Sequence, residues 1–150
     1  MSSEKRKIAY IDGKPYEIGA NHTSILKFVK SYVGEKKVPT LCDDPNLAPY
    51  GACRVCSVEV ALEKDGPTKM VASCHTPVAE NQHIFTSNEA ITSLRKNIVE
   101  LVLTDHPMEC DSCEVNNNCE LQTVANDLGI SDHRYNSPKQ HKGIPRDTSH

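Results

Sequence analysis

The sequence is poor in the residues that build large hydrophobic cores. Its 150 residues include no Trp and only two Phe, and aromatic residues make up 5% of the chain. A chain of this length normally forms one domain, or one small domain with a second compact unit. Hydrophobic residues make up 37%, and seven of them are cysteines. We therefore expect bound metal to contribute to folding.

Other absences argue against whole classes of function. The net charge of −3 and the pI near 6.1 give no basic surface for nucleic acid. The most apolar stretch, residues 98–103, is too short to span a membrane and contains Glu100. No apolar segment follows the charged N-terminus as it would in a secretory signal. No P-loop, dinucleotide-binding fingerprint or Ser/His/Asp pattern is present, so we expect no catalysis by this chain itself.

Cysteine is the residue that the chain has in excess. A closed disulfide framework would leave one of the seven unpaired. Without a secretory signal we expect a cytoplasmic location, where cysteine clusters usually serve metal or redox chemistry. All seven lie between Cys42 and Cys119. Together with one histidine they form two groups of four candidate ligands.

The first group combines one C-x2-C pair with two isolated cysteines. Its members are Cys42, Cys53, Cys56 and Cys74. A C-x2-C pair places two thiolates on one tight turn, and the small residues Gly51 and Ala52 would let backbone N–H groups approach a sulfide-bearing cluster. Four thiolates also suit structural zinc. Zinc sites more often combine two C-x2-C pairs, so the isolated cysteines favour a [2Fe–2S] cluster.

The second group contains a histidine. Its members are His106, Cys110, Cys113 and Cys119. A lone loop histidine is usually a plain polar residue. This one lies four residues before a C-x2-C pair, and no cysteine remains to act as a fourth ligand. The spacing fits a zinc site and a [4Fe–4S] cluster equally well. We expect the other six histidines to be surface or structural residues.

Local patterns predict a small sheet crossed by a helix. Residues 7–19 should form a hairpin around Asp12-Gly13. A helix capped by Asn21 or Thr23 and ended by Gly34 should follow. The apolar residues expected on its buried face are Ile25, Leu26, Phe28, Val29, Tyr32 and Val33. Strands are predicted at 57–62, with Val58, Val60 and Leu62 on one face, and at 69–72 and 83–86. This order suggests a β-grasp fold.

Two further helices are predicted beyond residue 86. The first should be capped by Ser87 or Asn88 and end near Thr104, because Pro107 constrains the residue before it. Its buried face should comprise Ile91, Leu94, Ile98, Leu101 and Val102. A short helix should span 120–128 and end at Gly129. The polar stretch from 131 to 150 reads as a linker or a partner-binding arm.

The paired motifs resemble one family. They are Thr40-Leu-Cys42, Pro49-Tyr-Gly-Ala-Cys-Arg-Val-Cys56, Val71-Ala-Ser-Cys-His-Thr-Pro77, Asp105-His-Pro-x-x-Cys-x-x-Cys113 and Cys119-Glu-Leu-Gln122. Over roughly residues 7–130 the chain resembles the N-terminal iron–sulfur electron-transfer module of the large peripheral (G-type) subunit of respiratory complex I. NAD-linked formate dehydrogenase alpha subunits, [FeFe]-hydrogenases and the diaphorase small subunit of NAD-reducing hydrogenases resemble it as well. Family members usually have Gly where this chain has Asn117, and Asn tolerates a left-handed backbone.

The resemblance implies an α+β architecture in three parts. Residues 1–87 would form a β-grasp [2Fe–2S] ferredoxin-like domain, and residues 88–130 a small helical [4Fe–4S] module. Residues 131–150 would be the polar tail. The first cluster would be held by Cys42, Cys53, Cys56 and Cys74, and the second by His106, Cys110, Cys113 and Cys119.

The implied function is electron transfer between partner subunits. One partner would be a flavin/NAD(P)H-oxidising subunit, and the other a catalytic oxidoreductase subunit of the formate dehydrogenase or hydrogenase type. The alternative is a docking module that zinc or a cluster stabilises without redox turnover. No membrane span and no nucleic-acid partner are expected.

Overall fold

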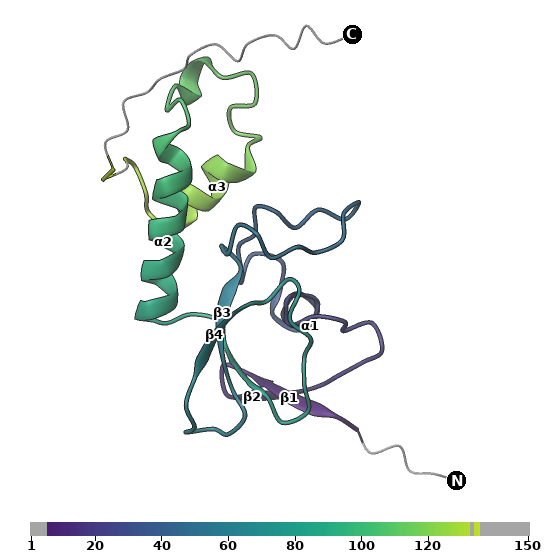
Figure 1. Ribbon diagram of the computed structural model, residues 1–150. Coiled ribbons are helices and arrows are strands. Elements are labelled where there is room, and N and C mark those ends of the chain that lie inside the picture. The colour runs from purple at the N-terminus through teal and green to yellow at the C-terminus, as the bar shows by residue number, and fades with distance from the viewer. Residues whose placement is uncertain (1–5, 133, 136–150) are drawn as a thin grey trace, which may run out of the picture.

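A five-stranded mixed sheet and three α-helices make up the described part of the chain. The computed structural model in Figure 1 describes residues 6–132, 134 and 135. The strands are β1 (Ile8–Ile11), β2 (Lys14–Glu17), β3 (Ser57–Ala61), β4 (Lys69–Ala72) and β5 (His83–Phe85). The helices are α1 (Ile25–Val33), α2 (Glu89–Thr104) and α3 (Glu120–Asp127), and a 3-10 turn covers Cys110–Ser112.

The strand order is β2-β1-β5-β3-β4. β1 pairs with β5 in parallel at the centre, and the other three pairings are antiparallel. A hairpin at each edge thus flanks the closing strand, and α1 packs against the sheet through the first core. This is the predicted α+β arrangement with a β-grasp domain. Figure 1 shows α2 and α3 side by side, beyond the end of the sheet.

The hairpin and the end of the first helix follow the prediction closely. Asp12 and Gly13 have φ angles of 48° and 83°, as a type I′ turn requires at both central positions. Gly34 ends α1 with φ 100°. The helix is capped by Ser24 and not by Asn21 or Thr23 as predicted. The Ser24 Oγ accepts a hydrogen bond from Lys27 N at 3.3 Å. Asn21 instead belongs to the preceding turn, where its carbonyl accepts from Thr23 N.

The buried face of α1 is shorter than predicted. Ile25, Leu26, Phe28 and Val29 are buried. Tyr32 and Val33 are 42% and 39% exposed, so the prediction of a buried last turn was wrong. The Tyr32 hydroxyl donates to the Glu17 carbonyl of β2 at 2.7 Å.

β3 is covered on both faces, which the alternating pattern did not reveal. The strand ends at Ala61, and Leu62 is 75% exposed instead of buried. Val58 packs in the first core, while Ser57 and Ala61 on the opposite face are also buried. α2 approaches that opposite face, and Asn88 Nδ2 donates there to Glu59.

A second core joins the helices to the first C-x2-C turn. Its buried members are Val55, Val99, Leu103, Val124, Ala125 and Ile130. α2 therefore buries Ile91, Arg95, Val99, Glu100 and Leu103. The predicted face was wrong in part: Ile91 is buried and Ile98 packs against the second core, but Leu101 and Val102 are 56% and 41% exposed. The residues that receive α2 come from α3 and from the loop around Val55, and local periodicity cannot identify them.

Asp12 ties the hairpin turn to the closing strand. Its carboxylate accepts hydrogen bonds from Thr86 N at 2.8 Å and from Thr86 Oγ1 at 2.6 Å. Lys37 Nζ lies 3.6 Å from the same carboxylate. Thr86 is fully buried, so its hydroxyl depends on this partner.

Replacing Asp12 with Ala is expected to lower the free energy of unfolding by roughly 1.5–3 kcal/mol, the range for hydrogen bonds to a charged group. Urea unfolding followed by circular dichroism measures the change. The control is Lys37→Ala, which removes only an exposed ion pair worth about 0–1 kcal/mol. Equal losses in the two variants would contradict this account of Asp12.

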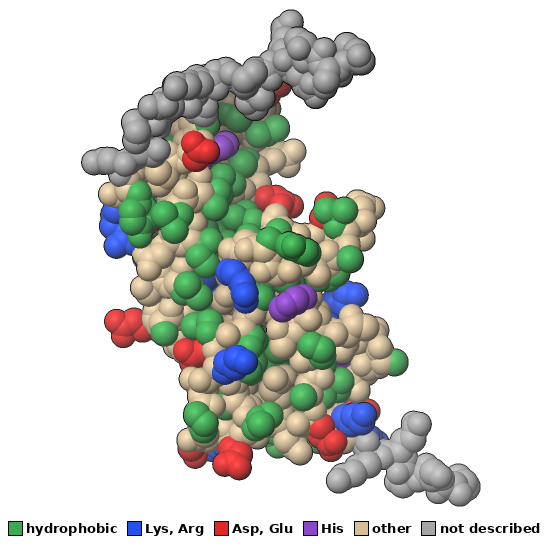
Figure 2. All heavy atoms as spheres, in the orientation of Figure 1, with side chains coloured by type: hydrophobic (Ala, Val, Ile, Leu, Met, Phe, Trp, Pro, Cys, Tyr) green, Lys and Arg blue, Asp and Glu red, His purple; other side chains and the backbone are tan. Residues whose placement is uncertain are grey.

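The tail after α3 is described only in part. Glu100 of α2, buried at 8% exposure, accepts from Arg134 Nε at 2.7 Å. Residue 133 and residues 136–150, most of the predicted linker or arm, lie outside the described residues. No helix among the described residues is long and apolar enough to cross a membrane. On the face drawn in Figure 2, acidic and basic side chains are scattered and form no broad patch of one sign.

Candidate functional site

The four cysteines of the first group lie together, with Cys56 directly before β3 and Cys74 shortly after β4. The side chains of Cys42 and Cys53 interact with each other, as do those of Cys56 and Cys74. The charge of Cys42 also raises the pKa of Cys74, so the two pairs are close enough to interact. Cys56 and Cys74 are buried, whereas Cys42 and Cys53 are partly exposed. The structure thus brings together all four residues of the predicted group.

Backbone N–H groups surround these sulfurs. The N–H of Cys53, assisted by that of Ala52, lowers the pKa of the Cys42 thiol. Burial raises the pKa of Cys53 although the N–H of Val55 acts against it. These donors come from the loop that the sequence marked by its small residues. Such N–H groups stabilise thiolate sulfur and tune the metal that it binds.

If all four cysteines of this group were deprotonated, a positive charge would be needed to balance them. Burial, reinforced by the charges of Cys56 and Cys42, raises the pKa of Cys74 to about 12. Four free thiolates would therefore repel one another in this site. A cationic iron centre would relieve that repulsion, because metal binding favours the deprotonated ligands. The chemistry of the donor set fits a cluster.

The turns of this loop need unusual backbone conformations. Gly51 has φ 70°, and a Cβ there would lie 3.4 Å from the His75 ring. Its N–H faces the Cys74 sulfur. Arg54, exposed inside the C-x2-C pair, has φ 63°. Its carbonyl accepts from Ser57 Oγ at 2.6 Å, which stabilises the turn.

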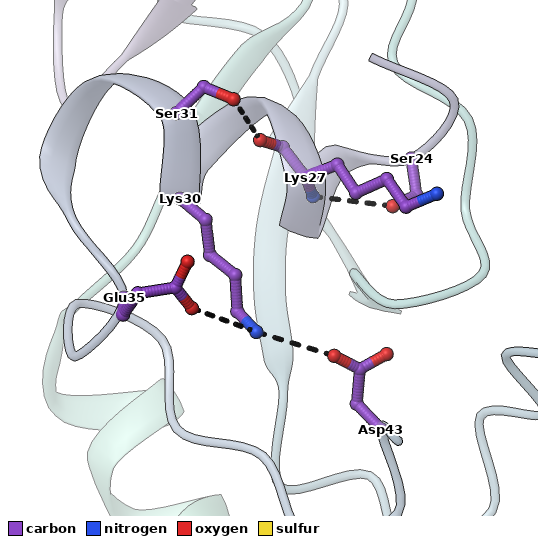
Figure 3. Close-up of polar contacts among 6 residues, drawn as sticks. All are labelled: Ser24, Lys27, Lys30, Ser31, Glu35 and Asp43. Atoms are coloured by element: carbon purple, nitrogen blue, oxygen red, sulfur yellow. Dashed lines mark hydrogen bonds and ion pairs between the residues drawn. The ribbon is translucent and has the colours of Figure 1, made fainter. Parts of the chain in front are cut away.

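Lys30 of α1 holds the segment that follows Cys42. Figure 3 shows its ammonium between the carboxylates of Glu35, at 3.2 Å, and Asp43, at 3.3 Å. Burial works to lower the pKa of Lys30, but the two carboxylates outweigh it and raise that pKa. The contact with Asp43 positions the residue directly after Cys42 against a well-packed helix.

The second group lines a single cavity between α2 and α3. The cavity has a volume of about 280 Å³, and His106, Cys110, Cys113 and Cys119 are all in its wall. The rest of the wall is largely apolar, with Leu103, Met108 and Leu121 among its residues. Apart from the 3-10 turn, the segment before α3 is irregular. The structure places the four predicted residues around one space.

Cys119 begins α3 and caps it. Its sulfur accepts a hydrogen bond from Gln122 N at 3.5 Å at the N-terminal end of the helix. Asn117 has φ 63°. This is the left-handed conformation expected at a position where family members usually have Gly. The Gln122 side chain accepts from Asn117 N at 2.8 Å and donates to Asn116 at 2.9 Å. Gln122 therefore stabilises the turn that leads into Cys119.

In neither group are the side chains as close together as the ligands of a single metal ion. Among the described residues, no three His, Cys, Asp or Glu side chains converge closely enough to hold a single ion. The thiolates of a cluster bind different iron atoms, so they lie farther apart than the ligands of a mononuclear site.

Sequence reasoning missed three residues that shape these sites. Gln122 was quoted in a motif without a role. Val55 was not assigned, yet it is fully buried in the second core while its neighbours Cys53 and Cys56 belong to the first site. Arg95 was also missed, although its place midway between Ile91 and Val99 on a helical period was a usable signal.

Two protein families match the chain in succession. Residues 7–89 match the 2Fe-2S iron-sulfur cluster binding domain. Residues 95–134 match the iron-sulfur binding region of NADH-ubiquinone oxidoreductase-G. The first match covers the sheet and the four-cysteine group, and the second covers the histidine-containing group.

Two similar proteins are much longer than this chain. The NADPH-Fe(3+) oxidoreductase subunit alpha of Geobacter sulfurreducens is 34% identical over 137 residues, which are 91% of this chain and 15% of the relative. The G-type subunit of NADH-quinone oxidoreductase from Escherichia coli K12 is 34% identical over 133 residues, 87% of this chain and 14% of the relative. The chain therefore spans about one seventh of the length of these relatives.

A solved structure has the same fold. The crystal structure of the NAD+-reducing [NiFe]-hydrogenase in the H2-reduced state contains a chain that matches with a TM-score of 0.72 and 24% identity. The match covers 87% of this chain and 52% of that chain. At this identity the match supports the fold alone.

Proposed function

Because this chain belongs to the family of 2Fe-2S cluster binding domains and continues into the iron-sulfur binding region of NADH-ubiquinone oxidoreductase-G, we propose that it relays electrons between two partner subunits. It is an iron–sulfur module with one [2Fe–2S] and one [4Fe–4S] cluster. When bound, these clusters supply one-electron redox chemistry. The chain supplies ligands, N–H donors and burial.

The proposed ligands of the [2Fe–2S] cluster are the four sulfurs of the first group. They are Cys42, Cys53, Cys56 and Cys74. The observation that carries this proposal is their arrangement as two interacting pairs among backbone N–H groups of the loop 51–55. Soft thiolates with N–H donors around them are the ligands that iron–sulfur clusters use.

The proposed ligands of the [4Fe–4S] cluster are the four residues around the cavity. They are His106, Cys110, Cys113 and Cys119. The His106 side chain is exposed, so solvent lies close to this site. One imidazole in place of a thiolate makes the site less negative. The His ligand should therefore raise the cluster's potential.

The proposed partners lie on either side of the electron path. One is a subunit that oxidises NAD(P)H through a flavin, and the other is a catalytic oxidoreductase subunit of the hydrogenase or formate dehydrogenase type. The relatives are subunits of an NADH-quinone and an NADPH-Fe(3+) oxidoreductase, which supports this class of partner. The proposed location is the cytoplasm, where thiols remain reduced. We further propose divisions near residues 87 and 130, because the last strand ends at Phe85 before α2 begins at Glu89, and Ile130 is the last buried residue of the second core.

Metal analysis with spectroscopy tests the function. The protein purified without oxygen should contain about six irons and about six acid-labile sulfides, the sum of the two cluster types. Reduction should produce two distinct EPR signals, and the reduced protein should pass electrons to an added acceptor. Zinc without any paramagnetic signal would favour the docking module and contradict the proposal.

Replacing His106 with Cys tests the imidazole ligand. The variant should keep a four-iron cluster, because a thiolate replaces the imidazole, but its reduction potential should fall as the site becomes more negative. An EPR-monitored redox titration measures the change. His75→Cys, beside the first site but outside the proposed ligands, is the control. An unchanged second-site potential in His106→Cys would show that His106 is not a ligand.

A further inference from the structure

Arg95 is a buried cation beside the four-cysteine site. It lies on the inner face of α2 and is only 5% exposed. Its Nη2 donates to the Ser57 carbonyl at 2.7 Å, on the residue directly after Cys56. Its Nε is buried and has no hydrogen-bond partner among the described residues. One end of the guanidinium is thus anchored, while its Nε–H is left unsatisfied within that part of the chain.

No carboxylate in the described part of the chain is paired with this charge. The ion pairs of the described residues involve Lys30, Lys37 and Arg134, and none includes Arg95. A buried charge without an opposite charge is strongly unfavourable. The negatively charged group that interacts electrostatically with Arg95 is the thiolate of Cys56. The four-cysteine site is therefore the source of opposite charge for this cation.

The guanidinium remains protonated under physiological conditions. Burial lowers the pKa of Arg95 to about 10, and the charge of Cys56 acts in the opposite direction. A positive charge thus persists next to a site that needs one. Four thiolates around a [2Fe–2S] core carry net negative charge, and one-electron reduction makes that charge larger.

We propose that Arg95 tunes the four-cysteine site, its buried positive charge stabilising the reduced state of the [2Fe–2S] cluster and so raising the cluster's reduction potential. This inference rests on the proposed function. The affected step is the addition of one electron, donated by the reduced partner subunit, with no proton transferred and no bond formed. The physical basis is that opposite charges attract strongly where water is excluded.

The test uses one charge-removing variant and a neighbouring control. In Arg95→Gln, the ratio of reduced to oxidised first cluster at a fixed solution potential should fall by about tenfold. For a one-electron couple this corresponds to a reduction potential lower by ~59 mV. The control is Lys96→Gln, which removes a partly exposed cation one residue away and should leave the ratio unchanged. Arg95→Lys keeps the charge, and its first-cluster potential should stay closer to that of the wild type than the potential of Arg95→Gln does. EPR of the whole protein, titrated with dithionite, reports each cluster separately.

Each outcome decides the inference. An Arg95→Gln potential equal to that of wild type, or a shift matched by Lys96→Gln, would overturn it. If Arg95→Gln takes up no first cluster, uptake by Arg95→Lys with a potential near that of wild type supports the charge. Loss of the cluster in both variants leaves only a packing role and overturns the inference. Absence of a [2Fe–2S] signal in the wild type would instead refute the proposed function.

Discussion

Replacing Cys113 with Ser is expected to remove the second cluster and leave the first in place. Iron should fall from about six to about two per chain, the number in a [2Fe–2S] cluster. One of the two EPR signals should disappear. Because Cys56 and Cys74 are buried in the first core and Cys113 is exposed outside both cores, the signal of the first cluster should persist.

The same substitution should also loosen the segment around the cavity. The Cys113 side chain is exposed, and the hydrogen bonds of residues 109–118 are short-range turns such as Cys113 N to Cys110 O at 3.1 Å. Such a segment depends on the bound group for its stability. Limited proteolysis should therefore cut the variant between residues 105 and 119, where it leaves the wild type intact.

The neighbouring Ser112 provides the control. Its hydroxyl donates to the Glu109 carbonyl at 3.1 Å in an exposed turn, and Ser112→Ala should retain the wild-type iron content and resistance to protease. If Cys113→Ser were as resistant to protease as Ser112→Ala, the dependence of this segment on metal would be refuted.

Replacing Phe28 with Ala should produce the largest loss of stability in the sheet domain. Phe28 heads the fully buried side chains in volume. Its ring packs against His22 at 5.2 Å and Tyr32 at 5.4 Å between centroids. Truncating a buried Phe to Ala typically costs about 3–5 kcal/mol. A chain with so few aromatic residues has little other packing to compensate.

The first cluster should be lost together with that stability. Cys56 and Cys74 belong to the same core as Phe28, so a cavity beneath them should loosen the site. Thermal unfolding and iron retention during desalting measure both effects. Val33→Ala, in the same helix but 39% exposed, is the control and should stay within about 0.5 kcal/mol of wild type. An equally small change in Phe28→Ala would contradict the central role of this side chain.

Much of the fold could be predicted because local rules govern it. Asp12-Gly13 requires positive φ angles at two consecutive positions, and the structure has them. Gly34 and Gly129 end helices where expected. The spacing of the cysteines placed two of them on one turn in each group. These features depend on residues close together in the chain, so a short window of sequence contains the information.

The predictions failed where a residue's neighbours come from distant segments. Leu101 and Val102 are apolar, but α2 turns another face inward because α3 and Val55 form its partner surface. Leu62 alternates correctly with Val60 but lies beyond the last residue of β3. Hydrophobic patterning records which residues are apolar, and only packing determines which of them find a partner.

By itself, the sequence determined the composition of the two sites, since thiol and imidazole chemistry and close spacing are local properties. It identified the eight candidate residues, from Cys42 to Cys119, and the family resemblance implied by their motifs. Only the tertiary structure brought Cys74 to Cys56, placed Val55 in the core of the helical part, and buried the charge of Arg95 beside the first site. These contacts join segments of the chain that lie far apart in sequence, and folding alone sets the electrostatic environment in which the electrons would move.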